Sequence, residues 1–98
     1  MTTAELVAKA RIWVGYTTTA FDDEITQTIN ACILDMRNGG VVYLELSDEL
    51  IQMAIKLYLK AFFRESDKSE RYERQYEFLK KSLENSSDYN RERETDES

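Results

Sequence analysis

The sequence predicts an all-α fold, a small bundle of about four helices, and three observations support that class. Apolar residues recur at helical spacing, and the chain has no Pro and only three Gly, a composition that favours helices over tight hairpins. The 98 residues allow a single domain with a modest core. The one apolar, β-branched segment, residues 41–46, has no second strand in the chain with which to form a ladder.

The first two helices are identified from their ends and their apolar stripes. The first is expected over residues 3–14, with Thr3 as its N-cap, Gly15 as its stop and Trp13 in the core. The second is expected over residues 22–38, where acidic residues in the first turn face the positive end of the helix dipole. Its buried stripe follows the 3.6-residue period and comprises Ile25, Ile29, Cys32, Ile33 and Met36.

The third helix, expected over residues 47–63 with Ser47 as its N-cap, is apolar over most of its circumference. Only Gln52, Lys56 and Lys60, at four-residue spacing, mark an edge that faces water. A surface helix of a small domain normally shows the opposite ratio of apolar to polar surface. This helix must therefore be covered by other helices, by a partner chain, or by both, which indicates a subunit made for assembly.

The segment between the second and third helices is the main candidate for an interface. Gly39 and Gly40 end the second helix, and residues 41–46 ("VVYLEL") then either cross the helical core or pack against a neighbouring subunit. Tyr43 could form an interface patch with its apolar neighbours, because Tyr is enriched at interface hot spots. For Tyr72, Tyr76 and Phe78 of the fourth helix a core position is favoured over a docking surface, because two of the three lie on the apolar stripe, and Tyr72 and Tyr76 are kept as interface candidates. The candidate subunit or partner interface comprises Val41, Val42, Tyr43, Leu44, Leu46, Tyr72 and Tyr76.

The fourth helix is expected over residues 69–83, and Phe78 lies off its apolar stripe. That stripe comprises Tyr72, Tyr76, Leu79 and Leu83. Residues 84–98 contain one aromatic and no aliphatic residue, so we expect them to be disordered in the isolated protein. They hold two basic and six acidic residues, which give them most of the net charge of −6. The expected organisation is a helical domain over residues 1–83 and a disordered acidic tail over residues 84–98.

The sequence offers no catalytic, cofactor-binding or metal-binding residues. It has no His, a single Cys and no Gly-rich phosphate loop. Cys32 lies on an apolar stripe, where an unreactive structural thiol is expected. The acidic run at residues 22–24 is interpreted as favourable helix charge rather than as a Mg²⁺ site. We therefore expect a protein that is not an enzyme and has no cofactor, no signal peptide and no membrane span.

Two stretches of the sequence resemble a known family. The run Phe21-Asp22-Asp23-Glu24-Ile25 opens the second helix, and the third helix is rich in apolar residues from position 50 to position 64. With the order of helices over residues 3–83, these stretches resemble the phage head–tail connector proteins, also described as adaptor, head-completion or DNA-packaging proteins. Members often have a shorter segment between the second and third helices, and a contact between subunits would explain the longer one found here.

The resemblance implies a structural virion protein at the head–tail junction, assembled in the host cytoplasm. Its subunits would form a ring, expected to be dodecameric, below the portal protein. That ring would extend the DNA channel, through which DNA passes without sequence-specific binding, and would join the filled capsid to stopper or tail-completion proteins. The implied partners are the portal protein, the stopper or tail proteins and other copies of this chain, with no membrane involved.

Two other functions remain open from the residues alone. One is a small cytoplasmic helical regulator that binds one protein partner as a dimer. The other is a helix-turn-helix DNA-binding protein, which is disfavoured because no helix is predominantly basic. The basic residues of the fourth helix, Arg71, Arg74, Lys80 and Lys81, are balanced by Glu70, Glu73, Glu77 and Glu84. Ring assembly would distinguish the connector from the regulator, and salt-dependent binding to duplex DNA would support the third function.

Overall fold

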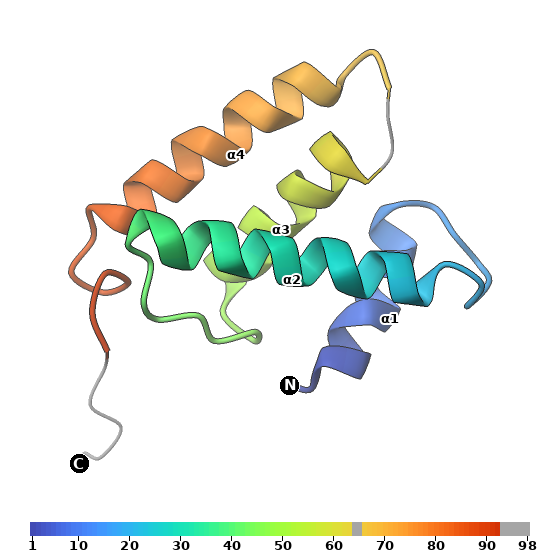
Figure 1. Cartoon of the computed structure of the whole chain (residues 1–98), viewed down its shortest axis with the longest axis horizontal. Helices are drawn as coiled ribbons and strands as arrows, with labels where there is room; N and C mark the ends of the chain where they lie inside the picture. The colour runs from blue at the N-terminus through green and yellow to red at the C-terminus, as the bar shows by residue number, and fades with distance from the viewer. Residues whose placement is uncertain (64–65, 93–98) are drawn as a thin grey trace.

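The computed structural model describes residues 1–63 and 66–92, and the regular structure over those residues is entirely helical (Figure 1). The helices are α1 (Thr3–Trp13), α2 (Asp22–Gly39), α3 (Glu49–Phe62) and α4 (Ser69–Glu84). The predicted all-α bundle is confirmed, and each predicted helix boundary lies within two residues of the observed one.

The central helix of the bundle is α3, which contacts α1, α2 and α4 and lies between α2 and α4 in Figure 1. The fully buried core residues come from all four helices and include Leu6, Ala10, Ile25, Ile29, Met36, Ile51, Ala54, Ile55, Leu59 and Tyr76. The other helices thus provide most of the cover that the apolar circumference of α3 requires. That cover is incomplete, because Leu50, Met53 and Phe62 remain 44–48% exposed.

Side-chain caps set the beginnings of two helices, each one residue away from the predicted position. Thr2, not Thr3, is the N-cap of α1: its hydroxyl accepts from the Glu5 N–H at 3.1 Å, and its own N–H donates to the Glu5 carboxylate at 2.7 Å. This reciprocal pair is a capping box. Asp48, not Ser47, is the N-cap of α3, because the Ser47 hydroxyl instead donates to a carboxylate oxygen of Glu45.

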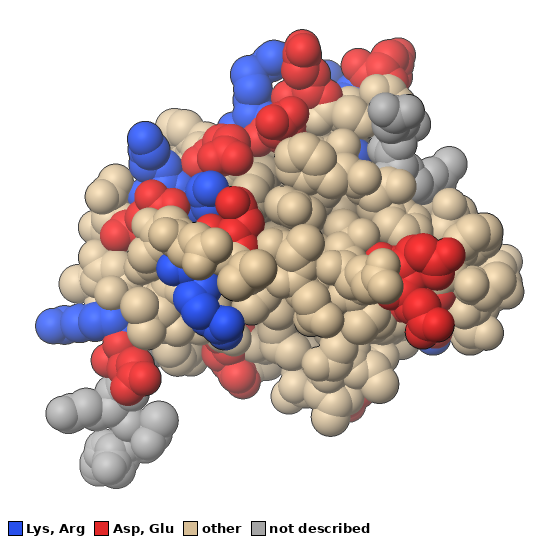
Figure 2. All heavy atoms as spheres, viewed as in Figure 1, with Lys and Arg blue, Asp and Glu red and all other residues tan. Residues whose placement is uncertain are grey.

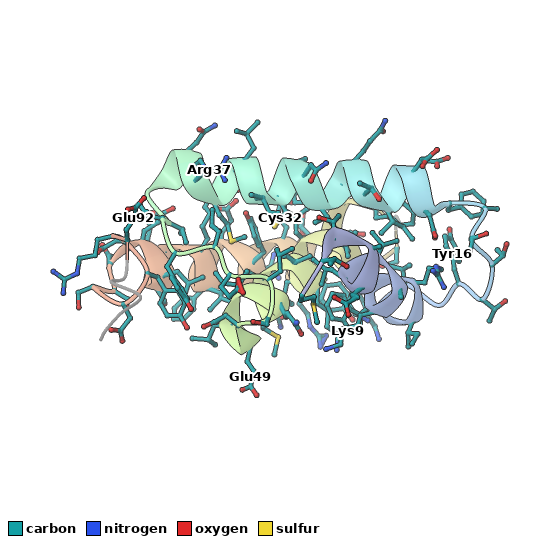
Figure 3. The ribbon with its side chains drawn as sticks, turned by 90° about the horizontal axis from the view of Figure 1, so that it is seen from below. Lys9, Tyr16, Cys32, Arg37, Glu49 and Glu92 are labelled. Atoms are coloured by element: carbon teal, nitrogen blue, oxygen red, sulfur yellow. The ribbon has the colours of Figure 1, made fainter. Side chains whose placement is uncertain are left out.

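A small polar network joins α2 to α4 beside the core. The Tyr76 hydroxyl donates to the Asp35 carboxylate at 2.6 Å, and the Lys80 ammonium lies 3.0 Å from the same carboxylate oxygen. Burial opposes ionisation of Asp35, but these two hydrogen bonds outweigh it and lower the pKa of its carboxyl group. Cys32 points from α2 into the interior, whereas Arg37 of the same helix points to solvent (Figure 3). Burial raises the pKa of the Cys32 thiol to about 12, as expected for an unreactive structural cysteine.

The structure differs from the sequence expectation over the first part of the predicted tail. Residues 85–92, here called the C-terminal segment, turn back over the chain between α2 and α3 and bury Tyr89. The Tyr89 carbonyl accepts from the N–H groups of Val42 and Tyr43, at 2.7 and 3.0 Å. The low apolar content of this segment predicts disorder. The observed contacts come instead from the side chain and the backbone carbonyl of a single residue, Tyr89. The rest of the predicted tail, residues 93–98, lies outside the described residues.

Candidate subunit interface

The segment between α2 and α3 has a partner inside its own chain. Val41 is fully buried, and the rings of Tyr43 and Tyr89 meet edge to face with centroids 5.9 Å apart. Leu44 and Leu46 are half-buried against the core. Of the two alternatives left by the sequence, the observed contacts correspond to a segment that completes the core. Val42 is 44% exposed, so among the predicted interface residues of this segment it is the one that stays exposed.

The two Tyr residues of the predicted interface have different positions. Tyr76 is fully buried, and its hydroxyl bonds to Asp35 within the chain. Neither Tyr76 nor Val41 is accessible to a partner in this structure, because both lie on the core side of their segments, where Tyr76 continues the apolar stripe of α4. Tyr72 lies one turn earlier in α4, is half-buried, and faces a cavity.

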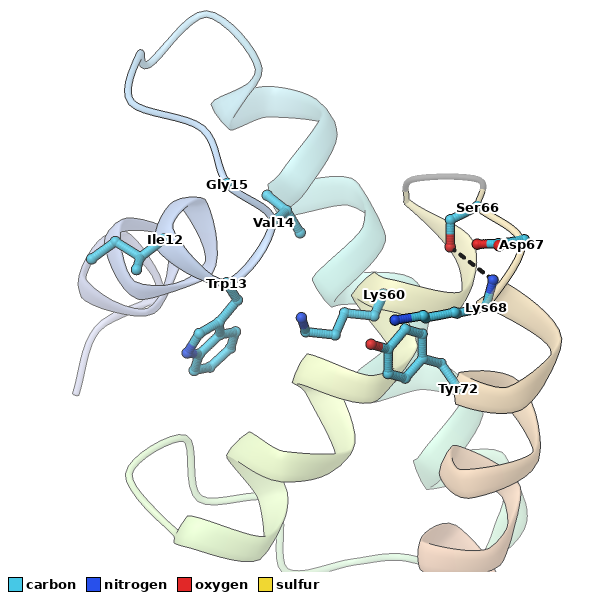
Figure 4. A pocket seen from close by; sticks show the side chains of 9 residues that line it. All are labelled: Ile12, Trp13, Val14, Gly15, Lys60, Ser66, Asp67, Lys68 and Tyr72. Atoms are coloured by element: carbon cyan, nitrogen blue, oxygen red, sulfur yellow. Dashed lines mark hydrogen bonds between the residues drawn. The ribbon is translucent and has the colours of Figure 1, made fainter.

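That cavity, here called the Trp13 groove, has a volume of about 450 Å³ and lies between the end of α1, the end of α3 and the start of α4 (Figure 4). It lies where α1 and α4 both pack on α3 while their described backbones stay apart, with no Cα–Cα distance of 8 Å or less between them. Its lining comprises Ile12, Trp13, Val14, Gly15, Lys60, Ser66, Asp67, Lys68 and Tyr72. Trp13 packs against the core, as expected, but it is only half-buried, so part of its surface is available to a partner.

Two cations point into the Trp13 groove. Lys60 extends from α3 and Lys68 from the start of α4, and both side chains point toward the gap beside Trp13 (Figure 4). The Lys60 ammonium lies 5.5 Å from the centroid of the Tyr72 ring, a cation–π contact. Neither Lys60 nor Lys68 forms an ion pair with a carboxylate of the described residues. The groove therefore combines aromatic walls with two cations that no described carboxylate pairs, and Asp67 also belongs to its lining.

A second exposed surface, here called the α4 outer face, lies on the side of α4 away from the core. Phe78 is 77% exposed there and lines a shallow hollow. The remaining residues of that hollow are Glu70, Glu73, Arg74, Glu77 and Lys81. The sequence favours a core position for Phe78 over a docking surface, and this preference is wrong, as its position off the apolar stripe could have indicated.

Charge is distributed unevenly over the surface. Charged side chains gather along α4, at the upper edge of Figure 2, whereas the face over the middle of α2 is largely uncharged. The uncharged face agrees with the sequence, since residues 25–34 contain no Asp, Glu, Lys or Arg. Depletion of charge is typical of protein interfaces, so this face of α2, where Leu34 is 54% exposed, is a further contact surface to consider.

The described residues do not form an arrangement suited to metal binding. No group of three or more Cys, Asp or Glu side chains within that part of the chain could hold a metal ion. None of the described helices has both the length and the hydropathy needed to cross a membrane. The surface instead presents exposed aromatic side chains and unpaired charges, which can contact a partner protein.

Comparison with known proteins gives one result. A family model described as "Phage connector protein" matches residues 7–90. The match extends from the middle of α1 past the end of α4 and includes Tyr89, so it contains most of the C-terminal segment as well as the helices. No curated protein and no solved structure is significantly similar to the chain.

Proposed function

This chain belongs to the phage connector protein family, and from that membership we propose that it is a head–tail connector that forms a ring below the portal protein. The family is structural, and its members act at the junction of head and tail. In this proposal the ring extends the DNA channel and joins the filled capsid to stopper or tail-completion proteins, after assembly in the host cytoplasm. The partners of each subunit are the portal protein, the stopper or tail proteins and other copies of the chain.

The family match over residues 7–90 is the observation that carries this proposal. The exposed surface is consistent with a subunit that has several neighbours. Large apolar side chains are exposed on every helix, with Ile12 on α1, Leu34 on α2, Met53 on α3 and Phe78 on α4. Single exposed apolar residues are common on monomers, but one on each helix provides contact points in several directions.

The charge of the chain supports passage of DNA without tight binding. The net charge is −6, and charges of like sign disfavour close contacts with phosphate. Proteins that bind DNA tightly neutralise phosphates with clustered Lys and Arg. On α4, the most charged helix of this chain, the cations alternate with carboxylates. A DNA channel with a wall of such subunits would let DNA pass without tight contacts to its phosphates.

Removal of the chain from the phage that encodes it tests the function. We expect a stop codon early in its gene to yield filled heads without tails, and a plasmid copy of the intact gene to restore infectious particles. A plasmid copy carrying the same stop codon is the matched control. Normal tailed particles from the mutant phage would contradict the proposal and would favour the small helical regulator.

A further inference from the structure

We propose that neighbouring copies of this chain contact each other head to tail, with Phe78 of one copy in the Trp13 groove of the next. The inference rests on the proposed ring and names the two surfaces that would form it. Phe78 and Ile12 are the most exposed large apolar side chains of the described residues, at 77% and 76%. One lies on the α4 outer face and the other at the rim of the Trp13 groove.

The Trp13 groove has room for an aromatic ring and a lining that suits one. Its volume is about 450 Å³, whereas an apolar cavity of roughly 150 Å³ already holds benzene. Trp13 and Tyr72 provide aromatic walls from two different helices, and Figure 4 shows the Lys60 side chain extending into the space between them. Aromatic pairs favour offset or edge-to-face geometries, which a ring entering between two others can adopt.

The Trp13 groove presents Lys side chains and the hollow beside Phe78 presents Glu side chains, so the two surfaces are complementary in charge. Lys60 and Lys68 point into the groove and form no ion pair with a described carboxylate. The hollow beside Phe78 contains three Glu side chains, and Glu73 among them forms no ion pair with a described cation. When Phe78 enters the groove, Glu73 comes near these ammonium groups. The groove also contains Asp67, and the α4 outer face also contains Lys81 and Arg74, whose guanidinium pairs with Glu70. Glu77 lies 3.3 Å from the Lys80 ammonium.

The occupant assigned to the groove is a second copy, because the positions of the two surfaces exclude a contact within one chain. Phe78 lies on the opposite side of α4 from the Tyr76 stripe, so it cannot reach the groove of its own chain, which opens beside α3. When two copies join through two different patches, the joined pair still has one free patch of each kind. Such a heterologous contact adds subunits in one direction and closes into a ring when the rotation permits.

Cross-linking within purified phage particles tests this contact in the assembled state. The test chain carries D67C and K81C together, at the rim of the groove and beside Phe78, and particles are treated with a short bismaleimide before denaturing electrophoresis. We expect a ladder of bands that extends beyond the dimer, because every copy then links to two neighbours. Particles with D67C alone or K81C alone are the matched controls, and we expect only monomer from each. Cys32 contributes no background because it is fully buried.

The outcomes separate this inference from the proposed function. Absence of the ladder in particles that contain the normal amount of the double variant would overturn the head-to-tail contact and leave the connector function standing. A dimer from K81C alone would also overturn it, because that product requires two α4 outer faces to meet. If the unmodified chain is absent from the particles, the proposed function fails and the inference fails with it.

A charge exchange provides an independent readout of the same contact. We expect K68E and E73K each to reduce incorporation into particles at least threefold when introduced singly. The combined K68E/E73K chain should recover most of the loss, because every contact then pairs the exchanged charges. Failure of the combined chain to recover, with unchanged thermal unfolding of the isolated protein, would contradict the proposed pairing.

Discussion

The Tyr89 hydroxyl lies 3.0 Å from both carboxylate oxygens of Asp48, the residue that caps α3. The same carboxylate accepts from the N–H groups of Leu50 and Ile51, at 2.9 and 3.2 Å. Asp48 thus begins the central helix and holds the C-terminal segment against it. This link explains why residues beyond α4 belong to the folded domain.

The first prediction concerns Tyr89. We expect Y89F to lower the free energy of unfolding by about 1 kcal/mol, since it removes a hydrogen bond to a carboxylate. Y89A should lower it by about 2–4 kcal/mol, because the ring packed on Tyr43 is also lost. Urea unfolding followed by circular dichroism measures both values. An unchanged unfolding midpoint for Y89A would show that the C-terminal segment contributes nothing to the fold.

The second prediction compares two adjacent residues at the start of α3. We expect D48A to lower the free energy of unfolding by about 1–2 kcal/mol through loss of the N-cap, in addition to the loss of the Tyr89 partner. S47A is the control and should change it by less than about 0.5 kcal/mol, because Ser47 is an exposed residue that does not cap the helix. Equal effects of the two substitutions would contradict the assignment of Asp48 as the cap.

The third prediction concerns the pH dependence that Asp35 contributes. Its folded-state pKa is lowered from the ordinary value of 3.8, so its contribution to stability is present above that pH and is lost as the pH falls through the folded-state pKa. We expect D35N to destabilise the protein by about 1–3 kcal/mol at pH 7, because the Tyr76 hydroxyl and the Lys80 ammonium lose a charged acceptor.

The difference between D35N and the unmodified chain should shrink as the pH is lowered below 3.8. Urea midpoints measured from pH 7 down to the acid limit of folding test this dependence. A difference that stays constant across the range would indicate that Asp35 acts through packing rather than through its charge.

The fourth prediction concerns the reactivity of Cys32. Because burial raises its thiol pKa to about 12, almost no thiolate is present at neutral pH in the folded protein. We expect a thiol reagent at pH 8 to react at least a hundredfold more slowly with the native protein than with the protein in urea. Labelling of the native protein at the rate of a free thiol would contradict the buried position of Cys32.

The sequence predicts the helices well because each carries a local signal. The apolar stripe of α2 and the nearly continuous apolar surface of α3 depend only on spacing along the chain. The predicted N-caps of α1 and α3 each lie one residue away from the observed ones. Thr2 stands beside Thr3 and Asp48 beside Ser47, and each of these residues can cap a helix, so the sequence does not decide between neighbours. Tyr76 illustrates the limit of this reasoning, because a Tyr on an apolar stripe is compatible with a core and with an interface.

The remaining features depend on contacts between distant segments. Tyr89 is held by Val42, Tyr43 and Asp48, more than 40 residues earlier in the chain, and no local pattern predicts that contact. The Trp13 groove requires Trp13, Lys60 and Tyr72 to meet from three helices. It lies where the backbones of α1 and α4 stay apart, which only the packing of both helices on α3 determines.

The most direct test of the connector function is a count of protein copies in purified particles of the encoding phage. Quantitative mass spectrometry should measure this chain and the portal protein in the same particles. The account predicts that the chain is present in near-equal amount to the portal subunit. Complete particles that contain the portal protein but not this chain would contradict it.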